Sequence, residues 1–266
     1  MGYRMVLAGQ TSTGKTAVAL EIARRVSLDN QKTVAMFSLE MSVAELYDRL
    51  YASVLGVDES RLSKGDLEQD EISRMGKVSD TFAQAPLFLD DDADKSLANL
   101  RSKARRLKIE QGLDLLIIDY IQLIHVPDFV ARHNRTEQLR HISESLKGLA
   151  RELDCPVIVL SQLSRAPSHR PDKEPQLSDI RDSGSIEQDA DFVLMLHRAS
   201  LYAPNPNEHE ERDITDLFLR KNRPHGKLGH FRLRFDVEKT RYLAVDEHHK
   251  SPVAEQATAK LAEAMS

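Results

Sequence analysis

The chain has 266 residues, of which 41% are hydrophobic, 30% charged and 5% aromatic, and this balance excludes collagen-like, disulfide-scaffold and fully disordered proteins. Its formal charge is −5, so contact with nucleic acid would require a local basic lining rather than a basic surface as a whole. Cys155 is the single cysteine and no apolar run approaches the ~20 residues of a membrane span, so we expect a cytoplasmic protein without a membrane partner.

Short apolar runs alternate with amphipathic stretches along the chain, which is typical of βαβ units and a largely parallel sheet. Most runs are continuously apolar, as strands buried on both faces are. The expected strands are residues 5–8, 33–37, 87–89, 115–118, 157–160, 192–196, 216–219, 231–235 and 242–245. The last three follow one another without room for crossover helices, so we predict that they extend the parallel sheet in antiparallel fashion.

Two helices and two long polar stretches complete the expected domain. Helices are predicted over residues 15–26 and 136–153, and Asn134 with Glu137 three residues later predicts the cap of the second. Polar residues 127–133 and 164–184 are expected to be irregular, and loops of such length are usually functional or disordered. Residues 1–246 are therefore predicted to form one domain, and the Ala-rich residues 247–266 a disordered tail.

The segment Gly-Gln-Thr-Ser-Thr-Gly-Lys-Thr, residues 9–16, lies between the first expected strand and the first expected helix. Two glycines separated by four residues and followed by Lys and Thr are typical of a phosphate-binding loop. In such a loop, backbone N–H groups face the phosphates, Lys15 contacts the β- and γ-phosphates, and the Thr16 hydroxyl ligates Mg²⁺. The residues expected to bind ATP are Gly9, Thr11, Ser12, Thr13, Gly14, Lys15, Thr16 and Ala17.

A triphosphate-bound metal also requires a carboxylate fixed near the loop. Asp119 ends the apolar run Leu-Leu-Ile-Ile-Asp, residues 115–119. In an open α/β sheet, ligands gather at the carboxyl ends of the strands. We therefore expect Thr16 and Asp119 to hold Mg²⁺.

Two further residues follow apolar strands, and each has two interpretations. Glu40 ends residues 34–40, where it would orient or deprotonate the attacking water, or would cap the helix that begins after it. Gln162 follows residues 157–160, where its neutral amide would bind a γ-phosphate or water, or would be an ordinary loop amide. Sequence physics alone leaves both choices open.

Five linked segments of the chain carry a resemblance to a known family. They are residues 9–16, 37–41, 116–123, 160–165 and 177–191. The last, Leu-Ser-Asp-Ile-Arg-Asp-Ser-Gly-Ser-Ile-Glu-Gln-Asp-Ala-Asp, is the most specific, since a generic ATPase has no reason to carry it. Over residues 4–245, the chain resembles the C-terminal motor domain of DnaB-type replicative DNA helicases. The resemblance implies an α/β fold of the RecA-like P-loop NTPase type, with a mostly parallel sheet flanked by helices.

The resemblance also implies an activity and a set of partners. Such proteins form homo-hexameric rings that hydrolyse ATP at subunit interfaces, translocate on single-stranded DNA and unwind duplex DNA. By this resemblance, Glu40 is expected to act as the general base, Asp119 to hold Mg²⁺ through water, and Gln162 to sense the γ-phosphate. Primase and helicase loaders are further expected partners. The chain begins a few residues before the first strand, so the family's N-terminal domain and linker helix are expected to be absent.

Two other elements acquire roles from the resemblance. Lys221-Asn222-Arg223 resembles a Lys-x-Arg element that enters the neighbouring subunit's site, where two cations would neutralise charge on the γ-phosphate; a solvated basic turn is the alternative. Pro224-His225-Gly226 replaces the family's usual Asn-Gly pair, which predicts a shorter turn. The DNA-binding residues are expected to be Arg181, Asp182 and Gly184, and contacts to phosphates predict sequence-independent, salt-sensitive binding.

Two other functions compete with the helicase interpretation. A RecA/RadA-type recombination ATPase would share the fold but leaves residues 37–41 and 177–191 unexplained. A nucleotide-dependent regulatory or binding module would hydrolyse ATP without unwinding DNA. Stimulation of hydrolysis by DNA distinguishes the motor from such a module.

Overall fold

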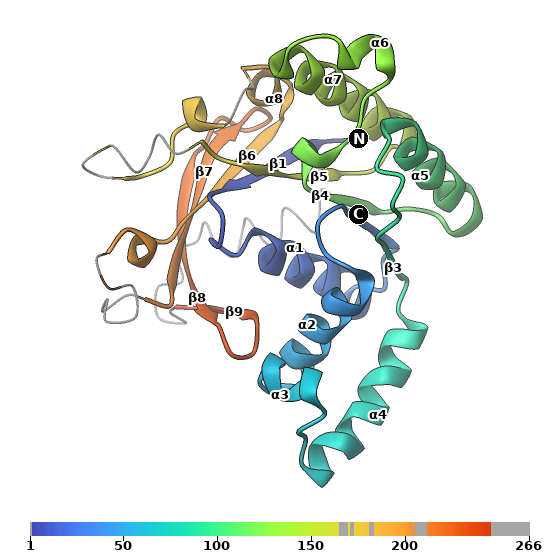
Figure 1. Cartoon of the computed structure of the whole chain (residues 1–266), viewed down its shortest axis with the longest axis vertical. Coiled ribbons are helices and arrows are strands. Elements are labelled where there is room, and N and C mark those ends of the chain that lie inside the picture. The colour runs from blue at the N-terminus through green and yellow to red at the C-terminus, as the bar shows by residue number, and fades with distance from the viewer. Residues whose placement is uncertain are drawn as a thin grey trace.

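One sheet of nine strands organises the part of the chain that the computed structural model describes, namely residues 2–164, 170, 173–180, 184–203, 205 and 212–245 (Figure 1). The strands are β1 (Arg4–Gly9), β2 (Val34–Ser38), β3 (Leu87–Asp90), β4 (Leu115–Asp119), β5 (Val157–Gln162), β6 (Phe192–His197), β7 (Ile214–Asn222), β8 (Gly229–Asp236) and β9 (Arg241–Ala244). Each coincides with one of the strands expected from the sequence, so those predictions are confirmed.

The order of the strands across the sheet is β3-β2-β4-β5-β1-β6-β7-β8-β9. Strands β1 to β6 pair in parallel, whereas β7, β8 and β9 continue the sheet through antiparallel pairs. The predicted antiparallel extension is therefore confirmed. Because β1, β2, β4 and β5 run in one direction, their carboxyl ends meet at one edge of the sheet, and the residues that follow them lie together there.

Helices cover both faces of the sheet (Figure 1). The α-helices are α1 (Lys15–Arg24), α2 (Val43–Leu55), α3 (Glu59–Lys64), α4 (Gln69–Gln84), α5 (Leu97–Gln111), α6 (Asp128–Ala131), α7 (Arg135–Leu153) and α8 (Gly184–Asp189). Shorter turns are the π-helical η1 (Arg25–Asp29) and the 3₁₀ turns η2 (Ile121–Leu123), η4 (Leu177–Asp179) and η5 (Ala199–Tyr202).

The core has two halves because side chains along each strand alternate between the two faces. Val6, Leu116 and Val157 face the half covered by α5 and α7, while Leu7, Ile117 and Ile158 face the half covered by α1 and α2. All these side chains are at most 4% exposed. Burial on both faces explains why the strands read as continuous apolar runs rather than as alternating ones.

Helix α7 forms where the sequence predicts it and with the predicted cap. The Asn134 side chain accepts a hydrogen bond from the Glu137 N–H at 2.9 Å, which satisfies one of the unpaired groups at the helix start. The residues at spacings of three and four that the pattern selected all lie in the core; they are Leu139, Ile142, Leu146, Leu149 and Leu153. This face fixes α7 against the sheet.

Some segments differ from expectation. The stretch 127–133, expected to be irregular, contains α6, because the Pro127 carbonyl accepts hydrogen bonds from the N–H groups of Val130 and Ala131 at 2.8 and 2.9 Å. The first helix ends at Arg24 and continues as η1. Helices α3 and α4 extend away from the sheet and share a small apolar core with α2 around Leu55 and Leu62 (Figure 1).

Other expectations fall outside the described residues. Arg181, Asp182 and the predicted tail over 247–266 belong to this group, together with much of the stretch 164–184. Among the described residues, no helix combines the length and the apolar character that crossing a membrane requires.

Candidate functional site

The loop between β1 and α1 has the backbone of a phosphate cradle. Ser12 and Gly14 have positive φ angles of 64° and 88°, so the chain turns sharply twice before α1 begins. The Thr13 hydroxyl, which is buried, donates to the Gln10 carbonyl at 2.8 Å and closes the turn. A Cβ atom at Gly9 would lie 2.5 Å from that hydroxyl oxygen, which explains the glycine at this position. Together these features direct the N-terminus of α1 toward the loop's interior.

Lys15 is the first residue of α1, and its side chain folds back over the loop. Its ammonium donates to the Gln10 carbonyl at 2.8 Å. Burial lowers the pKa of Lys15, while the nearby charges of Asp119 and Glu40 raise it. A cation that is partly removed from water and lies beside the N–H groups of a helix N-terminus is suited to bind an anionic ligand.

Asp119 and Thr16 meet as the sequence predicted. Asp119 is the last residue of β4 and is 2% exposed, and the Thr16 hydroxyl donates to its carboxylate at 2.6 Å. The peptide bond between Asp119 and Tyr120 is cis. Burial raises the pKa of Asp119, whereas the hydrogen bond from Thr16 and the charge of Lys15 lower it. A hydroxyl and a carboxylate oxygen thus lie side by side at the mouth of the loop.

This pair fits a magnesium ion held mainly by its substrate. Among the described residues, no three or more His, Cys, Asp or Glu side chains are grouped so that they could hold a metal. Mg²⁺ characteristically takes one or two protein oxygens and fills its remaining positions with phosphate oxygens and water. The donor set of Thr16 and Asp119 therefore suits Mg²⁺ bound together with a nucleotide.

Glu40 lies beside this pair because β2 and β4 are neighbours. Ser38 is in register with Asp119, and the Leu39 N–H donates to the Asp119 carbonyl at 2.7 Å, so the chain delivers Glu40 to the same edge. Glu40 is exposed. Burial raises the pKa of Asp119 and of Tyr120, and the charge of Glu40 adds to both shifts, whereas for Lys15 the same charge opposes the lowering of the pKa by burial. The alternative role as a helix cap is wrong: Ser42 caps α2 in a capping box with Glu45.

Gln162 also lies against the loop. It is the last residue of β5 and is in register with Gly9, and its side-chain amide donates to the Thr11 hydroxyl at 2.8 Å. The Gln122 side chain, which the sequence did not single out, accepts the Gln162 N–H at 3.3 Å and donates to the Ser161 hydroxyl at 3.1 Å. Two neighbouring amides therefore connect the ends of β4 and β5 to the phosphate loop.

Tyr242 is a second residue that the sequence did not connect with the site. From β9 its hydroxyl donates to the Thr13 carbonyl at 3.2 Å, and burial raises its pKa to about 12. A Cβ at Gly14 would lie 2.2 Å from the same hydroxyl oxygen. The loop is thus supported from behind by the C-terminal strand, a contact that no local sequence signal reports.

Lys221 and Arg223 lie at the opposite end of the sheet. Strand β6 is parallel to β1, with Phe192 beside Met5 and Leu196 beside Gly9, and Asn222 pairs with Phe192. Asn222 is therefore level with the start of β1, whereas the phosphate loop follows its end, roughly 13 Å further along the strand. These two cations are not directed at the phosphate loop of their own chain.

The turn after Arg223 closes without the Asn-Gly pair. The Gly226 N–H donates to the Asn222 carbonyl at 2.7 Å, and the Asn222 side chain donates to the Lys227 carbonyl at 2.9 Å. Gly226 has a φ of +67°, which a glycine adopts readily. The Arg223 side chain remains 47% exposed, so it is accessible to another molecule.

Of the predicted DNA-binding residues, Gly184 is described, and it is the first residue of α8. Upstream, the stretch is fixed at Asp179, which is buried and pairs with Arg170. The Asp179 carboxylate also accepts the Gln176 N–H at 2.6 Å, and its carbonyl accepts the Ser164 N–H at 2.8 Å. The described residues upstream of the predicted DNA-binding segment are therefore attached to the domain through Asp179.

A mostly parallel sheet with a phosphate loop after its central strand, β1, and an acidic residue at the end of β4, two positions away in the sheet, defines a RecA-like P-loop nucleoside triphosphatase. Within this class, the pattern of the DnaB-like helicase C terminal domain matches residues 2–244. The chain belongs to that family. The resemblance inferred from the five sequence segments is confirmed.

Named relatives agree with this assignment. The chain is 40% identical to a probable replicative DNA helicase of Trieres chinensis and 38% identical to the replicative DNA helicase DnaB of Geobacillus stearothermophilus. These alignments cover 90% and 91% of this chain but 52% of each relative. The chain thus spans about half the length of the relatives it matches.

Solved structures support the same conclusion. A structure described as an ATPase domain has a TM-score of 0.84 and 34% identity, and the match covers 92% of this chain and 85% of that one. A DnaB-like replicative helicase, studied with its interactions with primase, has a TM-score of 0.84 and 33% identity, over 92% of this chain and 57% of that one. A KaiC-like protein of Pyrococcus horikoshii OT3, with a TM-score of 0.59 and 14% identity, shares the fold.

Proposed function

We propose that the chain is the ATP-hydrolysing motor of a replicative DNA helicase, acting in a homo-hexameric ring that moves along single-stranded DNA and unwinds duplex DNA. The observation that carries the proposal is that two sets of charged residues lie at opposite ends of the sheet. Lys15 and Asp119 lie at one end of the sheet, and Lys221 and Arg223 at the other. Such a chain completes a hydrolytic site when two copies meet.

ATP is the proposed substrate, held by the loop from Gly9 to Ala17. The backbone N–H groups and the start of α1 would surround the phosphates, with Lys15 on the β- and γ-phosphates. The Thr16 hydroxyl would turn from Asp119 to Mg²⁺, and Asp119 would hold a water of the metal's shell. When bound, Mg²⁺ neutralises charge between the β- and γ-phosphates.

Glu40 is the proposed general base. It is exposed at the same edge as Lys15 and Asp119, where its carboxylate would orient water and accept its proton. Gln162 would contact the γ-phosphate in place of Thr11. From the neighbouring copy, Lys221 and Arg223 would stabilise the charge that develops on the γ-phosphate, which makes hydrolysis depend on the interface.

DNA is proposed to bind at residues 181–184, where the Arg181 side chain and the backbone amides of Asp182 and Gly184 would contact its phosphates. Contacts of this kind carry no base information and weaken with salt. Primase and a helicase loader are proposed partners of the whole protein; the primase proposal draws support from the solved relative studied with primase. We also propose a cytoplasmic location, consistent with a single buried cysteine.

The proposal is tested by measuring ATP hydrolysis with and without single-stranded DNA while light scattering follows assembly across protein concentration. We expect hydrolysis that rises with assembly and is stimulated by DNA. Lys15→Ala should abolish tight nucleotide binding, since the loop loses its fixed cation. Hydrolysis by a monomer that is indifferent to DNA would contradict the motor and favour a nucleotide-dependent binding module.

A further inference from the structure

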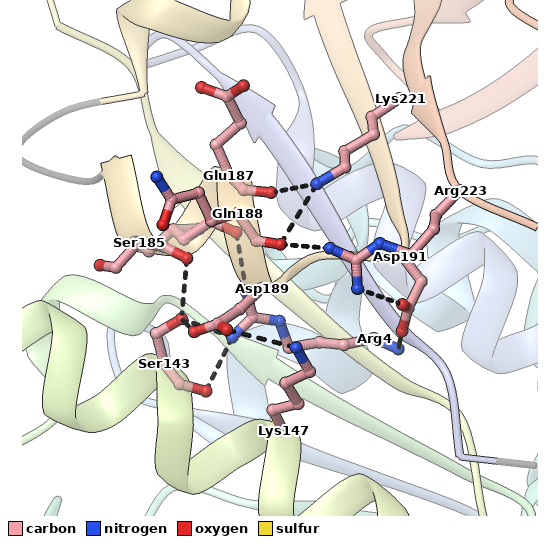
Figure 2. A network of polar contacts seen from close by, with 11 residues as sticks. Arg4, Ser143, Lys147, Ser185, Glu187, Gln188, Asp189, Asp191, Lys221 and Arg223 are labelled. Carbon is pink, nitrogen blue, oxygen red and sulfur yellow. Dashed lines mark hydrogen bonds and ion pairs between the residues drawn. The ribbon is translucent and has the colours of Figure 1, made fainter. Parts of the chain in front are cut away.

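The side chains of Lys221 and Arg223 both end on helix α8 (Figure 2). The Lys221 ammonium donates to the Glu187 carbonyl at 2.7 Å and to the Gln188 carbonyl at 3.3 Å. The Arg223 guanidinium donates to the same Gln188 carbonyl at 2.5 Å. Carbonyls in the last turn of a helix have no partner within the helix and carry partial negative charge, so two cations stabilise this end of α8.

Asp191 holds the base of the same turn. Its carbonyl accepts the Arg223 N–H at 2.8 Å, and its carboxylate accepts the Arg223 guanidinium at 3.3 Å. The other carboxylate oxygen accepts the Arg4 N–H at 3.0 Å, and the Asp191 N–H donates to the Arg4 carbonyl at 2.9 Å. One residue therefore attaches Arg223, by backbone and side chain, to the first residue of β1.

Arg4 connects this attachment to helices α7 and α8 (Figure 2). It is 1% exposed, and its guanidinium donates to the Ser143 hydroxyl at 2.6 Å and to the Ile186 carbonyl at 2.7 Å. Burial lowers its pKa to about 10, and Asp189 and Asp191 oppose that shift, so Arg4 is charged at neutral pH. Burying such a charge is costly unless it is paired and hydrogen-bonded, as it is here. The network joins α7, α8 and the starts of β1 and β6.

The other end of α8 begins at Gly184, which is itself one of the proposed DNA-binding residues. The helix has six residues and is therefore about 9 Å long, which brings its two ends close together. Ser143 and Lys147 of α7 hold it through Asp189, at 2.8 and 3.3 Å. A short helix held at several points moves as one body, so a displacement at Gly184 reaches the carbonyls that contact Lys221 and Arg223.

We propose that Asp191 is a positioning residue: it holds Arg223 at the C-terminal end of α8, where Lys221 also binds, so that both cations move with the helix that follows the DNA-binding segment. The inference rests on the proposed function, in which both cations act on the neighbouring subunit's nucleotide. It deepens that function by giving the route through which DNA contact changes hydrolysis.

The test is Asp191→Asn in the full chain, with DNA-stimulated ATP hydrolysis as the readout. The substitution keeps the shape of Asp191 but removes the charge that holds Arg223. We expect kcat to fall about 10-fold to 100-fold, the effect of a catalytic group displaced by about 1 Å, with KM for ATP unchanged. Asp216→Asn is the matched control: Asp216 lies on β7, the strand that carries Lys221, and pairs with His230 and Arg232 of β8, away from α8. An undiminished kcat in Asp191→Asn would overturn the inference.

Mixed assemblies separate positioning from a general structural defect. An Asp191→Asn subunit retains its own phosphate loop, and a Lys15→Ala subunit retains its own Lys221 and Arg223. Mixing the two should restore part of the hydrolysis, because some interfaces then combine an intact loop with correctly held cations. If folding of Asp191→Asn fails, Asp191→Glu, which keeps the charge but displaces it, carries the same test.

A parallel mixture distinguishes failure of this inference from failure of the proposed function. Arg223→Ala mixed with Lys15→Ala tests trans action alone. If that mixture regains hydrolysis and the Asp191 mixture does not, the positioning role is refuted and trans action stands. If neither mixture regains hydrolysis, the proposed trans action fails, and the inference fails with it.

Discussion

Removing the hydroxyl of Tyr242, which supports the phosphate loop through the Thr13 carbonyl, should weaken nucleotide binding. In Tyr242→Phe, the Thr13 carbonyl loses its 3.2 Å hydrogen bond in a buried position. A neutral hydrogen bond of this kind contributes about 1 kcal/mol. If the freed loop relaxes in the nucleotide-free chain, binding must restore its shape, and about 1 kcal/mol corresponds to about a fivefold rise in Kd. The measurement is a titration with a fluorescent ATP analogue.

Tyr51→Phe provides the matched control for this prediction. The Tyr51 hydroxyl donates to the Ser79 hydroxyl at 3.0 Å between α2 and α4, away from the phosphate loop. Both variants should lose unfolding free energy by a similar amount, but Kd should change in Tyr242→Phe alone. Equal stability losses with an unchanged Kd in both variants would refute a supporting role for Tyr242 and leave a purely structural hydrogen bond.

Three further predictions concern the site and the core. Glu40→Gln should bind ATP normally but lose turnover in a single-turnover assay, and hydrolysis at the unmodified rate would rule Glu40 out as the base. Burial raises the pKa of Asp119, so the folded chain binds more protons than the unfolded chain between the ordinary and the raised pKa, and stability falls as pH rises through that window. Asp119→Asn should therefore raise the Tm of the nucleotide-free chain at pH 7 while hydrolysis is lost; a lower Tm would contradict this. Leu146→Ala in the centre of α7, a fully buried position, should cost about 2 to 5 kcal/mol in chemical unfolding, and a loss comparable to that at an exposed site would count against the packing described.

The strands and the main site residues were accessible to sequence reasoning because local signals determine them. An apolar run identifies a buried strand by itself, and residues that follow parallel strands meet at one edge whatever the details of packing. This explains why Asp119 and Glu40 could be assigned to the edge that carries Lys15. The placement of these residues follows from the order of strands and helices alone, without knowledge of any contact between distant side chains.

The contacts that escaped prediction join residues distant in the sequence. Tyr242 is 229 residues from Thr13, and Arg4 is 187 residues from Asp191. No periodicity or motif relates such pairs, because their meeting depends on how β8 and β9 fold over α1 and where α8 ends. Helix α6 escaped for a different reason: one turn stabilised by the Pro127 carbonyl is too short to produce a helical pattern.

The attachment of the phosphate loop to β9 also affects how the chain acquires function during synthesis. The loop leaves the ribosome before the rest of the sheet, and Tyr242 follows 229 residues after Thr13. Synthesis proceeds at about 5 to 20 residues per second, so Tyr242 is added roughly 10 to 45 s after Thr13. A nascent chain that ends before β9 has the whole phosphate-binding motif but lacks the hydroxyl that stabilises it. Full affinity for nucleotide therefore arises late, when nearly the whole domain has been made.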